Sequence, residues 1–224
     1  VSPSPRQCRA EPGEGAWEPV SQPLLRPLPG VDESKGKPPA YFYKTFIRPD
    51  PKRPYSQVML IAMDMRQLEL GMEAGFEDPK PLTGPAGAGR LPRDKDVTDR
   101  IVATFNGAFK TTHGKYGMMV NERVLLPPVP GAATVMVTED RKVGLGSWPQ
   151  TEEIGEEVVS FRQNLDPLLE DGVANPTGRF IWGWQLSGKS VLTQRTALCV
   201  TAAGHLYYAF ATEVHGPTLG TISA

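Results

Sequence analysis

The stretch RIVATFNGAF, residues 100–109, gives the first indication of how this chain folds. Its first half, residues 101–105, is a short apolar and β-branched run of the kind that forms a buried strand. Asn106 and Gly107 follow at once, and both tolerate the positive φ at which a strand can end abruptly. The pattern predicts a strand end that holds the Asn106 carboxamide, a hydrogen-bond donor and acceptor, at the edge of a sheet. An ordinary hairpin turn explains the same Asn-Gly pair.

A second stretch, QRTALCV at residues 194–200, places Arg195 and Thr196 at the start of another apolar run. A guanidinium at the entrance of a buried strand needs an anionic partner or a ring of hydrogen-bond acceptors. A phosphodiester offers two non-bridging oxygens that match the fork of the guanidinium. An internal carboxylate would serve equally well, so the residues alone leave both partners open.

These two strand ends resemble the phosphodiester glycosidase family, the relatives of the lysosomal uncovering enzyme that removes N-acetylglucosamine from phosphomannose groups. In that family an N-G-G-[FY]-F-like turn and an R-[ST]-A-[IL] strand start occur in this order. Here they read FNGAF and QRTAL, and Ala108 stands in place of the commoner second glycine. The resemblance extends over residues 41–224 and is to the bacterial type of member.

The resemblance implies a hydrolase that cleaves the anomeric C–O bond of a sugar joined to a phosphodiester. In that role Arg195 neutralises the phosphate, and Thr196 supports Arg195. Asn106, with the backbone of Gly107, orients the phosphate or a sugar hydroxyl. The rival function is a non-catalytic carbohydrate or sugar-phosphate binding domain, and a purely structural β-rich module is a third interpretation.

A carboxylate that positions water is also implied, and Asp64 is the candidate within the chain. Asp64 interrupts QVMLIAMDM, residues 57–65, an almost continuously apolar run that predicts a strand covered on both faces. It is either a general acid or base, or a solvated strand end. In the family an acidic, glycine- or asparagine-containing motif follows the segment that ends here. We therefore expect a domain truncated at its C-terminus, with the essential carboxylate beyond residue 224.

Three further side chains are candidate substrate-binding residues, and each has a plainer interpretation. His113 lies in a polar, glycine-punctuated stretch that either closes over a ligand or is an ordinary loop. Arg162 follows a short strand pattern and either contacts a phosphate or is an exposed strand-end arginine. Trp182 belongs to an alternating aromatic stripe that either stacks on a sugar or packs in the core.

We expect an α+β fold that is predominantly antiparallel β-sheet with few helices, as the resemblance implies and as a strand-rich composition allows. The 23 glycines and 23 prolines separate short apolar runs, which is typical of a turn-rich, strand-rich chain. With 224 residues, of which 39% are hydrophobic, the chain can bury the core of a single domain. We expect a proline-rich, extended lead-in over residues 1–39 and the glycosidase-like domain over residues 40–224.

Short β-favouring runs separated by turn residues locate the expected elements along the chain. A pattern-free segment rich in proline, glycine and charge, residues 78–99, is expected to be a surface loop. Besides the runs already named, strands are expected at residues 41–47, 118–120, 123–126, 133–138, 142–145, 158–161 and 206–210.

Charge and motif content exclude several classes of partner. A formal net charge of −1 gives no field that attracts nucleic acid, and no apolar run is long enough for a membrane span. The three histidines lack metal-ligand spacing and no phosphate-binding glycine loop is present, so we expect neither metal nor cofactor. The expected partner is a small-molecule or glycan sugar phosphodiester. Family habit implies export, and the oligomeric state is left open.

Overall fold

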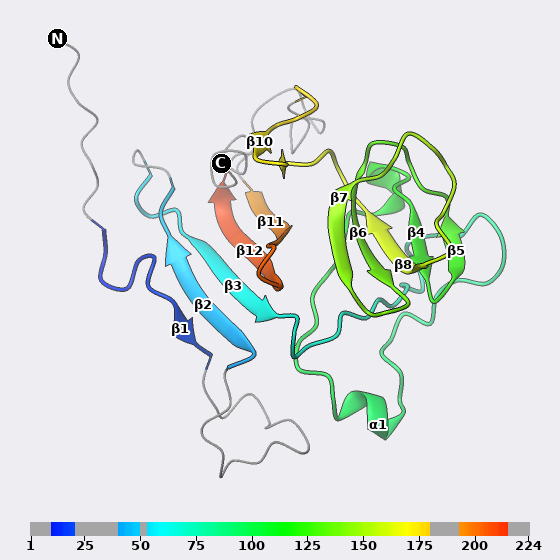
Figure 1. The fold of residues 1–224 in the computed structure, drawn as a ribbon, viewed down its shortest axis with the longest axis horizontal. Helices are drawn as coiled ribbons and strands as arrows, with labels where there is room; N and C mark the ends of the chain where they lie inside the picture. The colour runs from blue at the N-terminus through cyan, green and yellow to red at the C-terminus, as the bar shows by residue number, and fades with distance from the viewer. Residues whose placement is uncertain (1–9, 21–39, 50–52, 180–192, 215–224) are drawn as a thin grey trace. The chain divides into compact units, whose positions relative to one another are not determined.

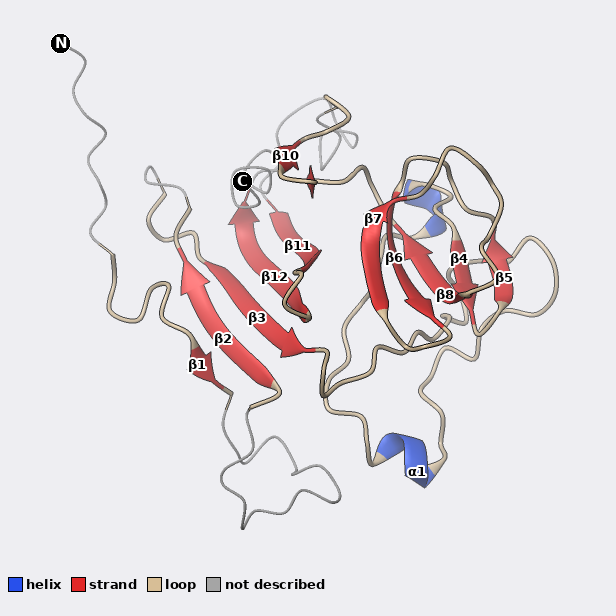
Figure 2. Ribbon diagram, in the orientation of Figure 1, coloured by secondary structure: helices blue, strands red, loops and turns tan. Residues whose placement is uncertain are grey.

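The computed structural model describes residues 10–20, 40–49, 53–179 and 193–214. These residues form two compact units, and each unit is built around its own five-stranded antiparallel sheet. Strands far outnumber helices in both units, as Figure 2 shows. In the part of the chain that is described, no helix is long and apolar enough to cross a membrane.

The first unit contains the described parts of residues 1–20, 40–68 and 168–224. Its sheet has the strand order β1-β2-β3-β12-β11, and every neighbouring pair is antiparallel (Figure 1). The bounds of these strands are Glu18–Pro19 for β1, Phe42–Ile47 for β2, Val58–Asp64 for β3, Thr193–Val200 for β11 and His205–Val214 for β12. A separate short hairpin pairs β9, Leu169–Glu170, with β10, Val173–Ala174.

The register of this sheet explains one part of its core. Val58 of β3 lies opposite Ile47 on one side and opposite Ala211 of β12 on the other. Val58 and Ala211 are buried, and Leu60 and Ala209, another cross-strand pair, pack against them together with Ile47. Neighbouring residues of three strands therefore contribute small and branched apolar side chains to one cluster, and such side chains pack well on a pleated sheet.

The second unit is the described continuous segment that runs from residue 69 to residue 167. Its sheet has the order β5-β4-β8-β6-β7 and is also antiparallel (Figure 1). The strands are β4, Met118–Val120; β5, Arg123–Leu126; β6, Ala133–Thr138; β7, Val143–Ser147; and β8, Val158–Gln163. The β4–β5 hairpin turns at Asn121 and Glu122, whose φ values of 48° and 64° are typical of a primed two-residue turn.

The centre of the second sheet is β8, which pairs with both β4 and β6. Phe161 of β8 is fully buried, and its ring centroid lies 4.9 Å from that of Trp148. Met119 and Val158 complete this buried cluster. Burial of two aromatic side chains at one contact makes this cluster a large source of stability for the unit.

The antiparallel part of the predicted fold is confirmed. Strands form within a few residues of the bounds expected at 41–47, 57–65, 118–120, 123–126, 133–138, 142–145, 158–161, 194–200 and 206–210. The helical part of the α+β description has little support. The described residues contain only α1, Lys95–Thr98, and the 3₁₀ turn η2, Thr111–His113. Residues 10–20 of the proline-rich lead-in include β1, whose Glu18 pairs with Lys44 of β2. The single domain over residues 40–224 stays a prediction.

The strand predicted at residues 101–105 is wrong. The backbone N–H of Ile101 donates to the carbonyl of Thr98, so this run continues the turn that ends α1. None of residues 101–105 belongs to a strand, and Ala103 and Thr104 are exposed. An apolar, β-branched run becomes a strand only where a neighbouring strand accepts its hydrogen bonds, and the local pattern cannot supply that neighbour.

The last residue of β8, Gln163, satisfies buried polar groups of two neighbouring segments. Its Oε1 accepts hydrogen bonds from the N–H groups of Gly117, at 3.1 Å, and Val129, at 2.6 Å. Its Nε2 donates to the carbonyl of Val129 and to Oγ1 of Thr134. The side chain is fully buried, so every one of these bonds replaces one that water would otherwise make.

We predict that Gly117→Ala destabilises the second unit by about 2 kcal/mol or more, because overpacking a rigid contact forces the backbone apart. An added Cβ would lie 2.6 Å from Gln163 Oε1 and 2.7 Å from the carbonyl oxygen of Pro127. Urea denaturation followed by tryptophan fluorescence measures the loss, since Trp148 is buried in this unit. Gly71→Ala is the matched control, because a Cβ there meets nothing within 4 Å. Equal stability of the two variants would contradict the prediction.

Candidate functional site

Arg162, next to Gln163 on β8, holds the loop that follows Asn106 and Gly107. Its guanidinium donates from Nη2 to the carbonyl of Phe109, at 2.9 Å, and from Nη1 to the carbonyl of Tyr116, at 2.7 Å. A longer bond of 3.2 Å joins Nη1 to the carbonyl of Gly117. Arg162 is buried, so its interpretation as an exposed strand-end arginine is wrong. Its role as a phosphate ligand stays a prediction.

Asp78 forms the second fixed point of this loop. Its carboxylate accepts a hydrogen bond from the backbone N–H of Thr111, 2.9 Å from Oδ1, and another from the Thr111 hydroxyl. Burial opposes ionisation, but these hydrogen bonds and the charges of Arg162 and Lys110 hold the pKa of Asp78 below its usual value. Burial in turn lowers the pKa of Arg162 and the Asp78 carboxylate raises it. Both groups are therefore charged near neutral pH.

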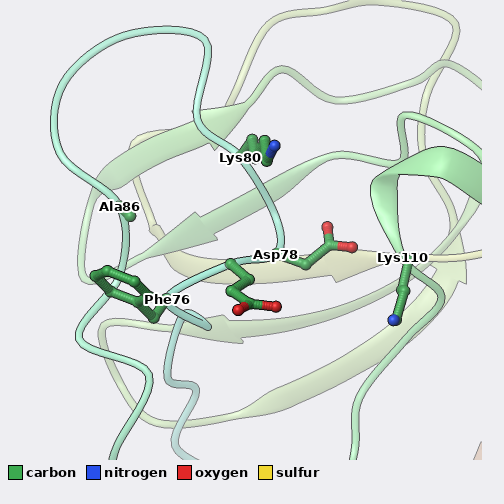
Figure 3. A pocket seen from close by; sticks show the side chains of 6 residues that line it. Phe76, Asp78, Lys80, Ala86 and Lys110 are labelled. Carbon is green, nitrogen blue, oxygen red and sulfur yellow. The ribbon is translucent and has the colours of Figure 1, made fainter.

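An open pocket of about 540 Å³ lies beside this carboxylate, and we call it the Asp78 pocket. In the view of Figure 3, the Asp78 carboxylate lies between the ammonium ends of Lys80 and Lys110. The pocket is lined by Phe76, Glu77, Asp78, Lys80, Ala86 and Lys110. It thus combines an aromatic ring with charged groups of both signs, and all of these residues belong to the second unit.

Asn106 and Gly107 are exposed and belong to neither a strand nor a helix. Neither is among the described residues with positive φ, so the tight turn expected for this pair does not form. A Cβ added at Gly107 would meet nothing within 4 Å. The Asn106 amide is therefore presented by an irregular segment, and its role in binding stays a prediction.

His113 is the last residue of η2 and is exposed. Its imidazole lies edge-on to the ring of Phe109, with 6.2 Å between the ring centroids. Arg162 binds the carbonyl of Phe109, the residue whose ring contacts His113. Of the two predicted residues, His113 therefore lies on the loop and Arg162 on the strand that supports it. An exposed imidazole on a loop fixed in this way is available to a ligand.

Asp64 ends β3 in the first unit and is buried. Its carboxylate accepts hydrogen bonds from Nε of Arg66 at 2.7 Å, from Nη2 of Arg66 at 2.8 Å and from Nε2 of Gln67 at 2.9 Å. The hydrogen bonds from Arg66 hold the pKa of Asp64 far below its usual value despite burial. Such a carboxylate is a poor general acid or base near neutral pH, so this geometry favours a structural role.

Arg195 lies at the start of β11, which is at the edge of the sheet that the described residues form, next to an irregularity in its pairing with β12. It is half-buried, and burial lowers the pKa of its guanidinium. Its Nη1 donates a long bond of 3.3 Å to the carbonyl of Gln194. Thr196 follows as an exposed residue. Irregularities on edge strands often redirect a side chain at a functional site, which suits a ligand-binding arginine.

The register of β12 separates Asp64 from Arg195. Asp64 lies opposite His205, the first residue of β12, whereas Arg195 lies opposite Ala211, six residues further along. At the usual rise of a strand this places the two residues roughly 20 Å apart along the sheet. A single small ligand therefore does not contact both through this sheet.

The predicted site residues divide between the two units. Asp64, Arg195 and Thr196 belong to the first unit, and four others belong to the second, namely Asn106, Gly107, His113 and Arg162. Trp182 lies outside the described residues. Among the residues that the structure describes, no cluster of histidine, cysteine, aspartate or glutamate could hold a metal ion.

Sequence reasoning missed Asp78, Lys80 and Lys110. Asp78 and Lys80 lie in the segment predicted to be a surface loop, and neither belongs to a recognisable motif. The available signal was weak: Lys110 follows FNGAF directly, and Thr111 is a residue type that readily bonds a carboxylate. Only the fold brings Asp78, 33 residues earlier in the chain, to Thr111.

We predict that Arg162→Met destabilises the second unit by about 2 kcal/mol, because the carbonyls of Phe109 and Tyr116 lose a charged donor. Hydrogen exchange measured by mass spectrometry should show faster exchange in peptides that cover residues 109–117. Arg141→Met is the control, since Arg141 is an exposed arginine paired with Glu69. Unchanged exchange in the Arg162 variant would mean that these bonds do not order the loop.

We predict that Asp64→Asn lowers the free energy of unfolding at pH 7 by about 2 kcal/mol, through loss of charge-assisted hydrogen bonds. Because folding lowers the pKa of Asp64, its contribution is fully present above about pH 4 and is lost as the pH falls further. Urea denaturation at pH 7 and pH 3 should therefore show a difference between wild type and variant that shrinks at pH 3. Asp140→Asn, at an exposed pair with Lys142, is the control. A difference that is constant with pH would contradict this assignment.

Known proteins resemble this chain weakly in fold and do not match it in sequence. No family model matches it, and no curated protein sequence matches it. One solved structure that resembles it is the catalytic domain of zebrafish N-acetylglucosamine-1-phosphodiester alpha-N-acetylglucosaminidase, auto-inhibited by its pro-peptide. That match has a TM-score of 0.45 and 12% sequence identity, and it covers 81% of this chain. The chain spans 64% of the length of that structure, and the likeness is a weak one of fold alone.

Proposed function

We propose that this protein is a hydrolase that cleaves the anomeric C–O bond of a sugar phosphodiester. The proposal rests on FNGAF and QRTAL, which occur in the order of the phosphodiester glycosidase family. The structural observation that carries it is Arg195, which is half-buried at the irregular start of the edge strand β11. A guanidinium in that position can approach two non-bridging phosphate oxygens at once.

The proposed cleavage depends more on stabilisation of the developing charges than on a strong general acid. Cleavage builds positive charge on the sugar ring and negative charge on the departing phosphate. We assign neutralisation of the phosphate to Arg195, with Thr196 as its support. A phosphate monoester leaves readily, so the low pKa of Asp64 is no obstacle to departure of the leaving group. The water-positioning role expected for Asp64 from the sequence stays a separate prediction, because Asp64 is bound by Arg66 and Gln67. It also lies six residues along β12 from the position opposite Arg195, too far for both to contact one small ligand through this sheet.

The remaining assignments concern binding of the substrate. Asn106 and the backbone of Gly107 orient the phosphate or a sugar hydroxyl, and His113 lies on the loop that Arg162 holds. Trp182 is proposed as a stacking surface for the sugar. Export of the protein, expected from family habit, is likewise a proposal.

Hydrolysis of a panel of sugar-1-phosphate diesters by the full-length product of the gene tests this proposal. We predict that Arg195→Ala and Asn106→Ala each lower kcat/KM by about 100-fold or more, because each removes a donor to developing charge. Gln194→Ala is the matched control, since Gln194 is an exposed neighbour on the same strand. Circular dichroism establishes that each variant is folded.

The outcomes separate the proposed function from its rival. Turnover that collapses in both folded variants and survives in Gln194→Ala supports the hydrolase and its site. Turnover that is indifferent to Arg195→Ala and Asn106→Ala contradicts the assigned residues. Saturable binding without turnover of any diester contradicts hydrolysis and favours a carbohydrate or sugar-phosphate binding domain.

A further inference from the structure

We propose that the Asp78 pocket binds a phosphorylated sugar, with Lys80 and Lys110 holding the phosphate and Phe76 contacting the sugar ring. This proposal goes beyond the proposed hydrolysis and does not depend on it, because a binding site needs no turnover. All the residues that carry it lie in the second unit. The volume of about 540 Å³ is within the range of pockets that hold small molecules.

One contact fixes the backbone beneath both lysines. Thr111 binds the Asp78 carboxylate through its N–H, at 2.9 Å, and through its hydroxyl. Lys110 immediately precedes Thr111, and Lys80 follows Asp78 after the buried residue Pro79. The backbone positions of the two lysines are therefore held at a defined separation before a ligand arrives, which reduces the entropy lost on binding.

The negative charge of Asp78 is already compensated by groups within the protein. Thr111 donates two groups to it, and Arg162 and Lys110 both contribute nearby positive charges. Neither Lys80 nor Lys110 forms a salt bridge with another described residue, and both are exposed. Two ammonium groups at the mouth of one pocket thus remain available to an external anion. A phosphate monoester carries close to two negative charges at neutral pH and matches them.

The rest of the lining favours a sugar over a bare anion. Phe76 is 71% exposed and forms part of the pocket wall, so its ring is open to the C–H face of a sugar (Figure 3). Water leaves such an exposed ring favourably when an apolar face covers it. Two carboxylates of the lining can accept hydrogen bonds from sugar hydroxyl groups. One is that of Glu77. The other is that of Asp78, whose Oδ2 shares the Thr111 N–H with Oδ1.

Isothermal titration of the protein with glucose 6-phosphate, inorganic phosphate and glucose tests this inference. Glucose 6-phosphate carries its phosphate away from the anomeric carbon, so it is not a substrate for the proposed hydrolysis. Failure of hydrolysis and failure of this pocket are therefore distinguishable. We expect glucose 6-phosphate to bind most tightly, inorganic phosphate more weakly and glucose most weakly of the three.

Substitutions in the pocket then assign the binding. Lys80→Gln combined with Lys110→Gln should raise the Kd for glucose 6-phosphate by about tenfold or more, because two charged donors are removed. Phe76→Ala should weaken glucose 6-phosphate and leave inorganic phosphate unchanged. Lys115→Gln, an exposed lysine of the same loop that does not line the pocket, is the control. Circular dichroism reports whether each variant is folded.

Three results would overturn the proposal. The first is the absence of saturable glucose 6-phosphate binding to the wild-type protein. The second is an unchanged Kd in the folded double lysine variant, or a change of equal size in Lys115→Gln. The third is equal affinity for phosphate and glucose 6-phosphate together with no effect of Phe76→Ala, which would remove the sugar from the inference.

Discussion

The second unit depends on two consecutive polar residues at the end of its central strand. Successive side chains of a strand point to opposite faces, so Arg162 and Gln163 serve different sides of β8. Arg162 binds the carbonyls of Phe109, Tyr116 and Gly117, and Gln163 binds the backbone of Gly117 and Val129. Loops buried against a sheet must satisfy their backbone groups, and here two side chains do so. Loss of either would leave several buried polar atoms without partners.

Much of the sheet structure could be predicted from the sequence, because strands with a period-two or continuously apolar pattern carry their own signal. The hairpin at Asn121 and the strand that contains Val58 are examples, and both form where expected. Residues 101–105 have an equally good local pattern but no partner strand, so they form none. Pairing between distant segments decides such cases, and a single sequence does not reveal it.

The candidate site depends even more than the sheets on tertiary contacts that a single sequence does not reveal. Asn106, Arg195 and Asp64 were found because a motif or an interrupted apolar run drew attention to them. Asp78 and Lys80 lie in a segment without any pattern, and only a tertiary contact with Thr111 gives them significance. Asp64 illustrates the converse. The sequence left Asp64 as either a general acid or base or a solvated strand end, and the structure buries its carboxylate against Arg66, only two residues away.

The arginines of this chain show why residue type alone cannot assign an anion site. Arg48 is bound by Glu11 and Glu14, Arg66 by Asp64, and Arg162 by three carbonyls, so each of these guanidinium groups closes an internal contact. Internal acceptors of this kind compete with any phosphate for the same donors, and displacing them would cost the stability that they provide. A cation whose position is fixed through the backbone, and whose charged end stays exposed, has no internal acceptor of this kind to displace. Lys80 and Lys110 meet that condition through the contact between Asp78 and Thr111.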